Sequence, residues 1–268
     1  YQLYGEAHTP WQWYPALRDL ALQLGLISFS SPFDTTAVDF LEEMGVPAYK
    51  VASFEITDIP LIEYIASKGK PVLISTGIAT LADIEEAIDT CRKAGNDQIA
   101  LLKCSSTYPT GFHEIDLRTI PHLRDTFGVT VGLSDHSTGI SASIAAAALG
   151  ASIVEKHIIL DKSLGGPDAA FSLSPEEFSN MVRSIRETEM ALGRASYELS
   201  EGAKLSRTHS RSLFAVSDIM AGEPFTKANV RSIRPGQGLH PRHLSYVLAR
   251  RARVDIPRGT PLQWPHID

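Results

Sequence analysis

The sequence predicts a parallel α/β fold of the (β/α)8 barrel type, followed by a small C-terminal domain that is mostly β. Short apolar, β-branched runs alternate with helical segments up to about Gly193, which is typical of a parallel sheet buried on both faces. Polar residues gather at the C-terminal end of every run, as at the active face of a barrel. After Gly193 this alternation stops, which indicates a second domain.

Six runs are predicted as strands, because each is short, apolar and rich in β-branched residues. They are "LISFSSPF" (26–33), "AYKVAS" (48–53), "PVLIST" (71–76), "IALLKCSS" (99–106), "VTVGLSDH" (129–136) and "SIVEKHII" (152–159). Only a loop and a predicted helix from Tyr14 to Leu24 precede the first run. The barrel is therefore two units short, so we expect either a missing N-terminal part or an open sheet.

A doubly wound sheet is the alternative fold. Such a sheet usually collects its ligands at one switch point, whereas here all six runs end in polar residues. No GxGxxG motif follows a predicted strand. The barrel is therefore the favoured interpretation.

Two helices carry clear start signals. Thr80 and Asp83 suit a capping box, and so do Ser174 and Glu177. The apolar stripes expected to face the core are Ile84, Ala87, Ile88 and Cys91 in the first helix, and Phe178, Met181, Val182 and Ile185 in the second.

Composition and charge divide the chain into a barrel domain at 1–196, a linker at 197–212 and a small, mostly β domain at 213–268. The formal charge of −6 is unevenly spread, because residues 204–268 carry eleven Lys and Arg against four acidic residues. Dispersal of these basic residues among turns and apolar runs argues against nucleic-acid binding. A membrane surface, a small anion and the acidic face of another subunit are the other partners that this charge could bind.

No stretch approaches the roughly 18 apolar residues of a membrane helix, and no signal-peptide pattern opens the chain. A cytoplasmic location is therefore expected. The two cysteines, Cys91 and Cys104, form no CxxC motif and are predicted to be buried thiols.

Two histidines end consecutive predicted strands. His136 and His157 are separated by one crossover helix, and neighbouring strands lie about 4.8 Å apart, so both imidazoles can reach one cation. Without a nearby cysteine, the pair suits an open site for Mn²⁺, Mg²⁺, Co²⁺ or Zn²⁺. The alternative is two separately hydrogen-bonded polar residues. Alternation points Asp135 away from Ser134 and His136, so we expect it to hold the loop or the imidazole.

A second group of polar residues resembles a phosphate cradle with a carboxylate. Lys50 lies inside a predicted parallel strand, where an ammonium needs a partner or an anionic ligand. Hydroxyl donors and an acid could converge with it at the barrel mouth. They are Ser31, Ser53, Ser75, Ser134 and Glu55. Strand capping is the alternative role for each serine.

Two further residues are expected at the same rim. Asp168 follows the shaped turn of "LGGPDAAFSL", within range of a sugar hydroxyl or aldehyde. Tyr108, in "SSTYPTG", is a possible donor; its alternative role is a packed loop aromatic.

Together these motifs resemble the sialic acid synthase family, which condenses phosphoenolpyruvate with an N-acetylated sugar to make nonulosonic acids. The resemblance runs through "FSSPFD", "YKVASFE", "LISTGIAT", "KCSSTYP", "GLSDHS", "EKHIILDKSLGGPDAAFSL" and "RSIRPGQGLHP". It implies a barrel joined to an antifreeze-like (SAF) domain, in a homodimer whose C-terminal domains reach over the partner's active site. "EAHTPW", "ASFEITDIPLI" and "GPDAAFSL" are most similar to the pseudaminic acid branch.

The resemblance also implies residue roles. His136 and His157 match the ligands of Mn²⁺ or Mg²⁺, and Co²⁺ is a further possibility. The catalytic group it implies is Glu55, Lys50 and Asp168. The substrate contacts it implies are Ser31, Lys50, Ser53, Ser75 and Ser134 for phosphoenolpyruvate, Tyr108 and Asp168 for the sugar, and Arg234 from the other subunit. Ser106, also predicted to contact substrate, stands where sialic acid synthases usually have Asn, which argues against an unmodified N-acetylmannosamine acceptor.

The implied reaction joins phosphoenolpyruvate to a 2,4-diacetamido-2,4,6-trideoxy-hexose, with C–O cleavage and release of phosphate. One alternative is an N-acetylneuraminate or legionaminate synthase. Another is a truncated chain that binds ligand without turnover, because the two absent units would supply a further glutamate and lysine. Nucleic-acid binding by the basic C-terminal region is a third.

Overall fold

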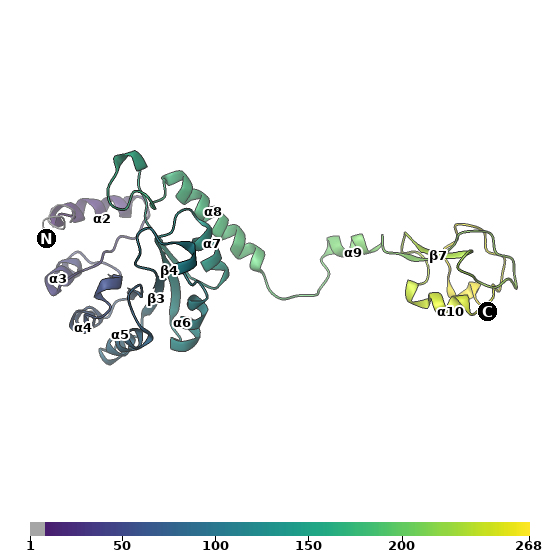
Figure 1. Cartoon of the computed structure of the whole chain (residues 1–268), viewed down its shortest axis with the longest axis horizontal. Helices are drawn as coiled ribbons and strands as arrows, with labels where there is room; N and C mark the ends of the chain where they lie inside the picture. The colour runs from purple at the N-terminus through teal and green to yellow at the C-terminus, as the bar shows by residue number, and fades with distance from the viewer. Residues whose placement is uncertain (1–8) are drawn as a thin grey trace. The chain divides into compact units, whose positions relative to one another are not determined.

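The structure, a computed structural model, describes residues 9–268, so residues 6–8 of "EAHTPW" lie outside the described residues. The chain forms two compact units that divide between Gly193 and Arg194. The first contains a parallel sheet with helices, and the second is small and mostly β (Figure 1). No helix among the described residues is both long and apolar enough to cross a bilayer.

The first unit alternates strands and helices as predicted. Its elements are α2 (Tyr14–Gln23), α3 (Thr35–Glu43), β1 (Tyr49–Val51), α4 (Ile59–Ala66), β2 (Val72–Ser75), α5 (Leu81–Lys93), β3 (Ile99–Cys104), α6 (Thr119–Phe127), β4 (Thr130–Asp135), α7 (Ser141–Ala148), β5 (Ile153–Lys156) and α8 (Pro175–Leu192).

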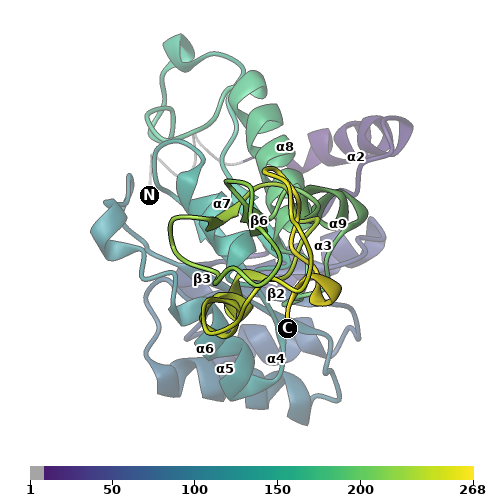
Figure 2. The ribbon, with the colours of Figure 1, turned by 90° about the vertical axis from the view of Figure 1, so that its right-hand side faces the viewer.

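The sheet is an open, five-stranded half-barrel with the order β1-β2-β3-β4-β5, and every neighbouring pair is parallel. The helices of this unit follow one another in an arc around the strands (Figure 1), and α4 lies beside α5 in both views (Figure 2). The prediction of a barrel-type sheet is therefore confirmed. All five strand ends meet at one edge, which brings their polar residues together.

The predicted strand at 26–33 is wrong. This segment has no regular structure, and its backbone bond to the sheet runs from Lys50 N to Ser30 O at 3.2 Å. Its apolar side chains are exposed: Ile27 is 76 % exposed and Phe33 is 64 % exposed. The segment has the composition of a strand buried between two neighbours. Within the described residues β1 is the edge strand of the sheet, so the segment has no strand on its other side to pair with.

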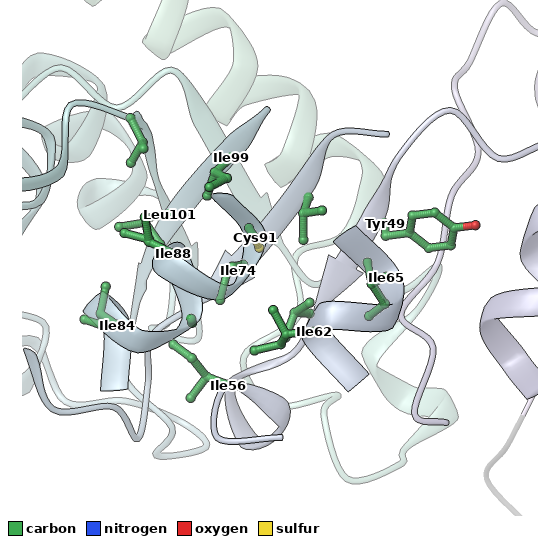
Figure 3. Close-up of a cluster of buried hydrophobic side chains, with 14 of the residues drawn as sticks. Tyr49, Ile56, Ile62, Ile65, Ile74, Ile84, Ile88, Cys91, Ile99 and Leu101 are labelled. Atoms are coloured by element: carbon green, nitrogen blue, oxygen red, sulfur yellow. The ribbon is translucent and has the colours of Figure 1, made fainter. Parts of the chain in front are cut away.

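Buried side chains from the helices and the sheet form one continuous core, which Figure 3 shows around Ile62, Ile74 and Ile88. Helix α5 begins at the predicted capping box of Thr80 and Asp83 and buries its predicted stripe. Helix α8 begins at the box of Ser174 and Glu177 and packs against α7.

The predicted stripe of α8 is only partly correct. Met181 is fully buried, but Val182, the next residue, is 41 % exposed. Adjacent residues point about 100° apart around a helix, so the narrow contact with α7 covers one and not the other. Both cysteines are buried, as predicted.

The second unit has its own small core, built around Leu213, Ala215, Phe225 and Val247. Its antiparallel pair, β6 (Ser212–Ala215) and β7 (Val230–Ile233), is extended by isolated bridges. Helix α9 (Glu201–Arg207) lies within the predicted linker, and one further short helix, α10 (Leu244–Leu248), lies in the small domain. The small β domain is therefore confirmed.

Candidate active site

The carboxyl ends of β3, β4 and β5 place a row of polar side chains on one face of the sheet. Cys104 pairs in register with Ser134, and Ser134 pairs with Glu155. Side chains alternate along a strand, so His136 and His157, two residues beyond Ser134 and Glu155, continue the same row. The two rings lie 5.2 Å apart, centroid to centroid, in an edge-to-face arrangement.

Glu155 links both sides of the half-barrel, and the sequence analysis did not select it. Its Oε1 accepts a 2.6 Å hydrogen bond from Ser134 Oγ, and its Oε2 lies 3.8 Å from Lys50 Nζ. The signal was present in "EKH", because alternation puts Glu155 on the same face as His157. Glu155 therefore joins the ends of β1, β4 and β5 in one charged cluster.

Lys50 is a buried cation at the end of β1. Its ammonium donates a 2.9 Å hydrogen bond to the carbonyl of Val51, and the residue is 7 % exposed. Burial lowers the pKa of Lys50, while the negative charge of Glu155 opposes that shift. A partly desolvated ammonium beside hydroxyl groups is suited to bind an anion.

A tight cradle forms where Gly77 meets Ser53, Ser106 and Cys104. The Gly77 amide donates a 3.2 Å hydrogen bond to Ser53 Oγ. A Cβ at Gly77 would overlap Ser106 Oγ and lie 2.8 Å from Ser53 Oγ and 3.1 Å from Cys104 Sγ. Glycine is therefore required at this position for the backbone to approach these side chains.

Three buried oxygens near these strand ends have no hydrogen-bond partner in the described part of the chain. They are Glu55 Oε2, Ser75 Oγ and Ser106 Oγ. Leaving a buried polar atom unpaired costs about 1–3 kcal/mol, so such atoms call for a ligand or ordered water. Burial also raises the pKa of Glu55, with Lys50 opposing the shift.

Each histidine has an acceptor beside its Nδ1. His136 Nδ1 lies 3.1 Å from the Ser105 carbonyl oxygen, a hydrogen bond, and His157 Nδ1 lies 3.4 Å from Asp168 Oδ2, an ion-pair contact. An acceptor beside Nδ1 leaves Nε2 available to bind a metal ion, as in many metal-binding histidines. Burial lowers the pKa of His157, and Asp168 opposes the shift.

His136 also faces a thiol. Its Nδ1 lies 3.7 Å from Cys104 Sγ. Burial acts to lower the pKa of His136, but the hydrogen bonds with Cys104 and Ser105 outweigh it, so the pKa is above its ordinary value. For Cys104, burial raises the pKa, and the contact with His136 helps to bring it below its ordinary value.

The two histidines suit a metal ion that keeps open coordination positions for water or substrate. Within residues 9–268, no three or more His, Cys, Asp or Glu side chains are grouped as a metal site. A divalent cation would therefore take one nitrogen from each histidine and complete its shell with water or substrate oxygens. The outer acceptors, Ser105 and Asp168, are already in place for this arrangement.

Two aromatic side chains form a wall of the histidine site. Phe171 is fully buried, and its ring centroid lies 4.9 Å from that of His157 and 5.8 Å from that of His136. Tyr108 is half-exposed, with its ring 4.2 Å from that of His136. Tyr108 was predicted from the sequence but Phe171 was not, because an apolar residue after a polar turn carries no signal of its partners.

Asp135 points to the opposite side of the sheet, as alternation predicts. Its carboxylate accepts hydrogen bonds from the Ser137 amide at 2.9 Å and the Ser143 hydroxyl at 2.7 Å. The prediction that it holds the loop is therefore confirmed. No contact between Asp135 and the His136 ring occurs in the described structure.

Ser31 is not joined to this cluster by any contact among the described residues of the first unit. Ser31 lies in the irregular segment and lines a cavity of about 770 Å³ with Trp11 and Phe40. A second cavity, of about 800 Å³, lies beside Arg118. Neither cavity is lined by Lys50, His136 or His157. Arg234 directly follows β7, in the second unit.

Comparisons with known proteins agree with this architecture. A family model described as the NeuB family matches residues 1–197, and a SAF domain model matches residues 210–268. The pseudaminic acid synthase of Helicobacter pylori is 42 % identical over 269 residues, covering 100 % of this chain and 79 % of that protein. The N,N'-diacetyllegionaminic acid synthase of Legionella pneumophila is 38 % identical, covering 94 % and 72 %.

Solved structures give the same result. The spore coat polysaccharide biosynthesis protein SpsE of Bacillus subtilis matches with a TM-score of 0.67 and 34 % identity, covering 97 % of this chain and 78 % of that one. The N-acetylneuraminic acid synthetase of Leptospira borgpetersenii matches with a TM-score of 0.71 and 31 % identity, covering 75 % and 70 %.

Proposed function

Because the chain belongs to the NeuB family of phosphoenolpyruvate-condensing transferases, we propose that it joins phosphoenolpyruvate to a 2,4-diacetamido-2,4,6-trideoxy-hexose. The product is pseudaminic acid. The observation that carries this proposal is the 42 % identity with pseudaminic acid synthases, together with a site that combines a buried cation, unpaired hydroxyls and two histidines.

The phosphoenolpyruvate site is assigned to the ends of β1, β2 and β3. Lys50 supplies the positive charge, and the hydroxyls of Ser75 and Ser106 are buried without partners among residues 9–268. A phosphate or carboxylate oxygen would accept hydrogen bonds from them and remove the cost of leaving them unpaired. The absence of a side chain at Gly77 lets Ser53 and Ser106 pack against the backbone there, which positions their hydroxyls for the ligand. Ser31 and Ser134 are proposed to complete the contacts.

The histidine site, around His136 and His157, is assigned to the acceptor sugar. His136 and His157 would hold Mn²⁺, Mg²⁺ or Co²⁺, which supplies Lewis-acid polarisation of the sugar aldehyde when bound. Tyr108 and Asp168 stand at this rim, both partly exposed, and can bind sugar hydroxyl or amide groups. The two substrates then lie side by side across Glu155, and fixing them there lowers the entropic barrier.

The bond changes follow from these positions. C3 of phosphoenolpyruvate forms a bond with the aldehyde carbon as the C2=C3 double bond opens, which leaves C2 cationic, and the aldehyde oxygen takes up a proton from solvent. A water molecule adds to C2 and gives one proton to Glu55. The C2–O bond to phosphate then breaks, phosphate leaves with the bonding electrons and the proton held by Glu55, and the C2 hydroxyl returns its remaining proton to solvent as the ketone forms. The raised pKa of Glu55 brings its proton affinity closer to neutral pH, which suits a group that accepts and returns a proton.

The second unit is proposed to complete the site in a homodimer. Its basic charge complements the acidic first unit, and opposite charges favour association between copies. Arg234 of the SAF domain would then reach the sugar of the other copy's active site. This charge asymmetry supports the proposal of a dimer.

A phosphate-release assay with three acceptors tests the substrate. We expect 2,4-diacetamido-2,4,6-trideoxy-altrose to give a kcat/KM at least about tenfold above those of the legionaminic acid precursor and N-acetylmannosamine, since misplaced polar groups are costly in a buried site. A preference for either of the other sugars would overturn the acceptor assignment. If none of the three sugars supports release of phosphate, the proposed reaction is overturned.

A further inference from the structure

A buried ion pair lies behind the histidine site, on the other face of the sheet. Asp135 ends β4, Lys156 ends β5, and the two residues are register partners. Lys156 Nζ lies 3.0 Å from Asp135 Oδ2, and the two side chains are 0 % and 1 % exposed. The members of this pair directly precede the two histidines, since Asp135 is followed by His136 and Lys156 by His157.

The pair belongs to a closed polar network. Asp135 Oδ1 accepts hydrogen bonds from the amide and the hydroxyl of Ser137, at 2.9 and 2.6 Å, and Oδ2 accepts one from Ser143 Oγ at 2.7 Å. Lys156 Nζ also donates to the Ser137 carbonyl. Ser137 and Ser143 are both fully buried. The network therefore ties β4, β5, the loop after His136 and helix α7 together.

Stability alone does not account for these charges. Replacing a buried ion pair by apolar residues of similar volume is often neutral or stabilising, because desolvation offsets the attraction between the charges. In some proteins such pairs serve to fix one arrangement of the chain. Here they fix the positions from which two imidazoles project, with ring centroids 5.2 Å apart.

We propose that Asp135 and Lys156 are positioning residues that set the spacing of His136 and His157 for a shared divalent cation. This inference rests on the proposed metal-binding role of the histidines. The pair contacts neither the cation nor the substrates. It acts through the backbone, because strand alternation directs each charged side chain and the following imidazole to opposite faces.

The test measures Mn²⁺ binding to the intact protein, without substrates, by titration calorimetry and by electron paramagnetic resonance of free Mn²⁺. The variant is the double substitution Asp135→Asn and Lys156→Met, which removes both charges at nearly constant volume. We expect it to fold and to bind Mn²⁺ about 10- to 100-fold more weakly, the usual effect of disturbing groups that orient metal ligands. The single substitution Lys156→Arg keeps the positive charge, so it should retain most of the parent's affinity for Mn²⁺.

A matched control removes another ion pair of the same unit. Glu42 and Lys70 are 2.8 Å apart and partly buried, and Glu42→Gln with Lys70→Met should leave the Mn²⁺ affinity unchanged. If the double variant of Asp135 and Lys156 does not fold, Ser143→Ala replaces it. That substitution removes one hydrogen bond from the network and should still weaken Mn²⁺ binding measurably.

The outcomes separate the two proposals. A parent protein that does not bind Mn²⁺ overturns the metal role of the histidines and this inference with it. A parent that binds Mn²⁺, with a folded double variant or Ser143→Ala variant whose affinity is within twofold of the parent, overturns the positioning role alone.

Discussion

The polar atoms in the two halves of the sheet edge differ in whether they have hydrogen-bond or ion-pair partners. At the ends of β4 and β5, Ser134 is bonded to Glu155, Asp135 to Lys156, and His136 to the Ser105 carbonyl. At the ends of β1, β2 and β3, three buried oxygens lack a partner among the described residues. The polar atoms of the first half are paired with one another, whereas the second half has unpaired buried oxygens that the proposed phosphoenolpyruvate ligand would satisfy.

This difference has a physical basis. A developing charge is stabilised best by groups that need not reorganise, so an assembled half suits the reacting aldehyde. Unpaired buried hydroxyls store a cost that ligand binding removes, so they suit recognition of an anionic substrate. The comparison assigns chemistry to the histidine half and binding to the cradle half.

His136→Ala is the strongest test of the assembled half. We expect it to lower metal-dependent kcat by about 1,000-fold or more, because the Lewis-acid contribution to the barrier is several kcal/mol. Circular dichroism should show an unchanged fold. His113→Ala, at a histidine whose side chain is 86 % exposed, is the matched control and should have no effect. Full activity of the His136 variant after metal removal would contradict the assignment.

Gly77→Ala tests the cradle half. The added methyl group would overlap Ser106 Oγ and crowd Ser53, so we expect the KM for phosphoenolpyruvate to rise roughly 30-fold, with a smaller change in kcat. Gly202→Ala, in α9 with no atom near the added Cβ, should leave the kinetics unchanged. An unaltered KM in the Gly77 variant would remove the cradle from the phosphoenolpyruvate site.

Glu155→Gln tests the link between the halves and should have the smallest effect near neutral pH. Burial lowers the pKa of Lys50, whereas the charges of Glu155, Cys104 and Glu55 act to raise it. Removing the charge of Glu155 therefore lowers that pKa further, so the protonated ammonium is lost at a lower pH. We expect the alkaline limb of the kcat/KM profile for phosphoenolpyruvate to move to lower pH.

Above that limb, kcat/KM falls about tenfold per pH unit if one proton is required, so the variant diverges from the parent as pH rises. Glu114→Gln, at a loop carboxylate whose ion-pair partner is the exposed His113, is the control. An alkaline limb that stays in place or moves to higher pH would show that Glu155 does not support the charge of Lys50.

Local patterns predicted most of the fold. The five strands of the sheet, the capping boxes at Thr80 and Ser174 and the small β domain were all visible in the sequence. The run at 26–33 was misassigned, because apolar composition reports a tendency to be buried and not the presence of a neighbouring strand. Val182 was misassigned for a similar reason, since the width of a helix contact depends on its partner.

The sequence predicted which kinds of residue form the candidate site better than it predicted the contacts between them. Alternation placed Ser134 and His136 on one face and Asp135 on the other, and the structure agrees. The sequence could not reveal that Glu155 bridges to Lys50, because that contact joins residues 105 positions apart. Nor could it reveal that Gly77 lies against Ser106, since backbone approach depends on how the strands curve together.

The sequence by itself determined the alternation of strands and helices, the polar strand ends and the family, because these depend on local periodicity and on motifs. Only the tertiary structure decided which polar atoms are paired and which are left for a ligand. That distinction depends on distances between strands that are far apart in the chain. It separates the assembled histidine half from the cradle half.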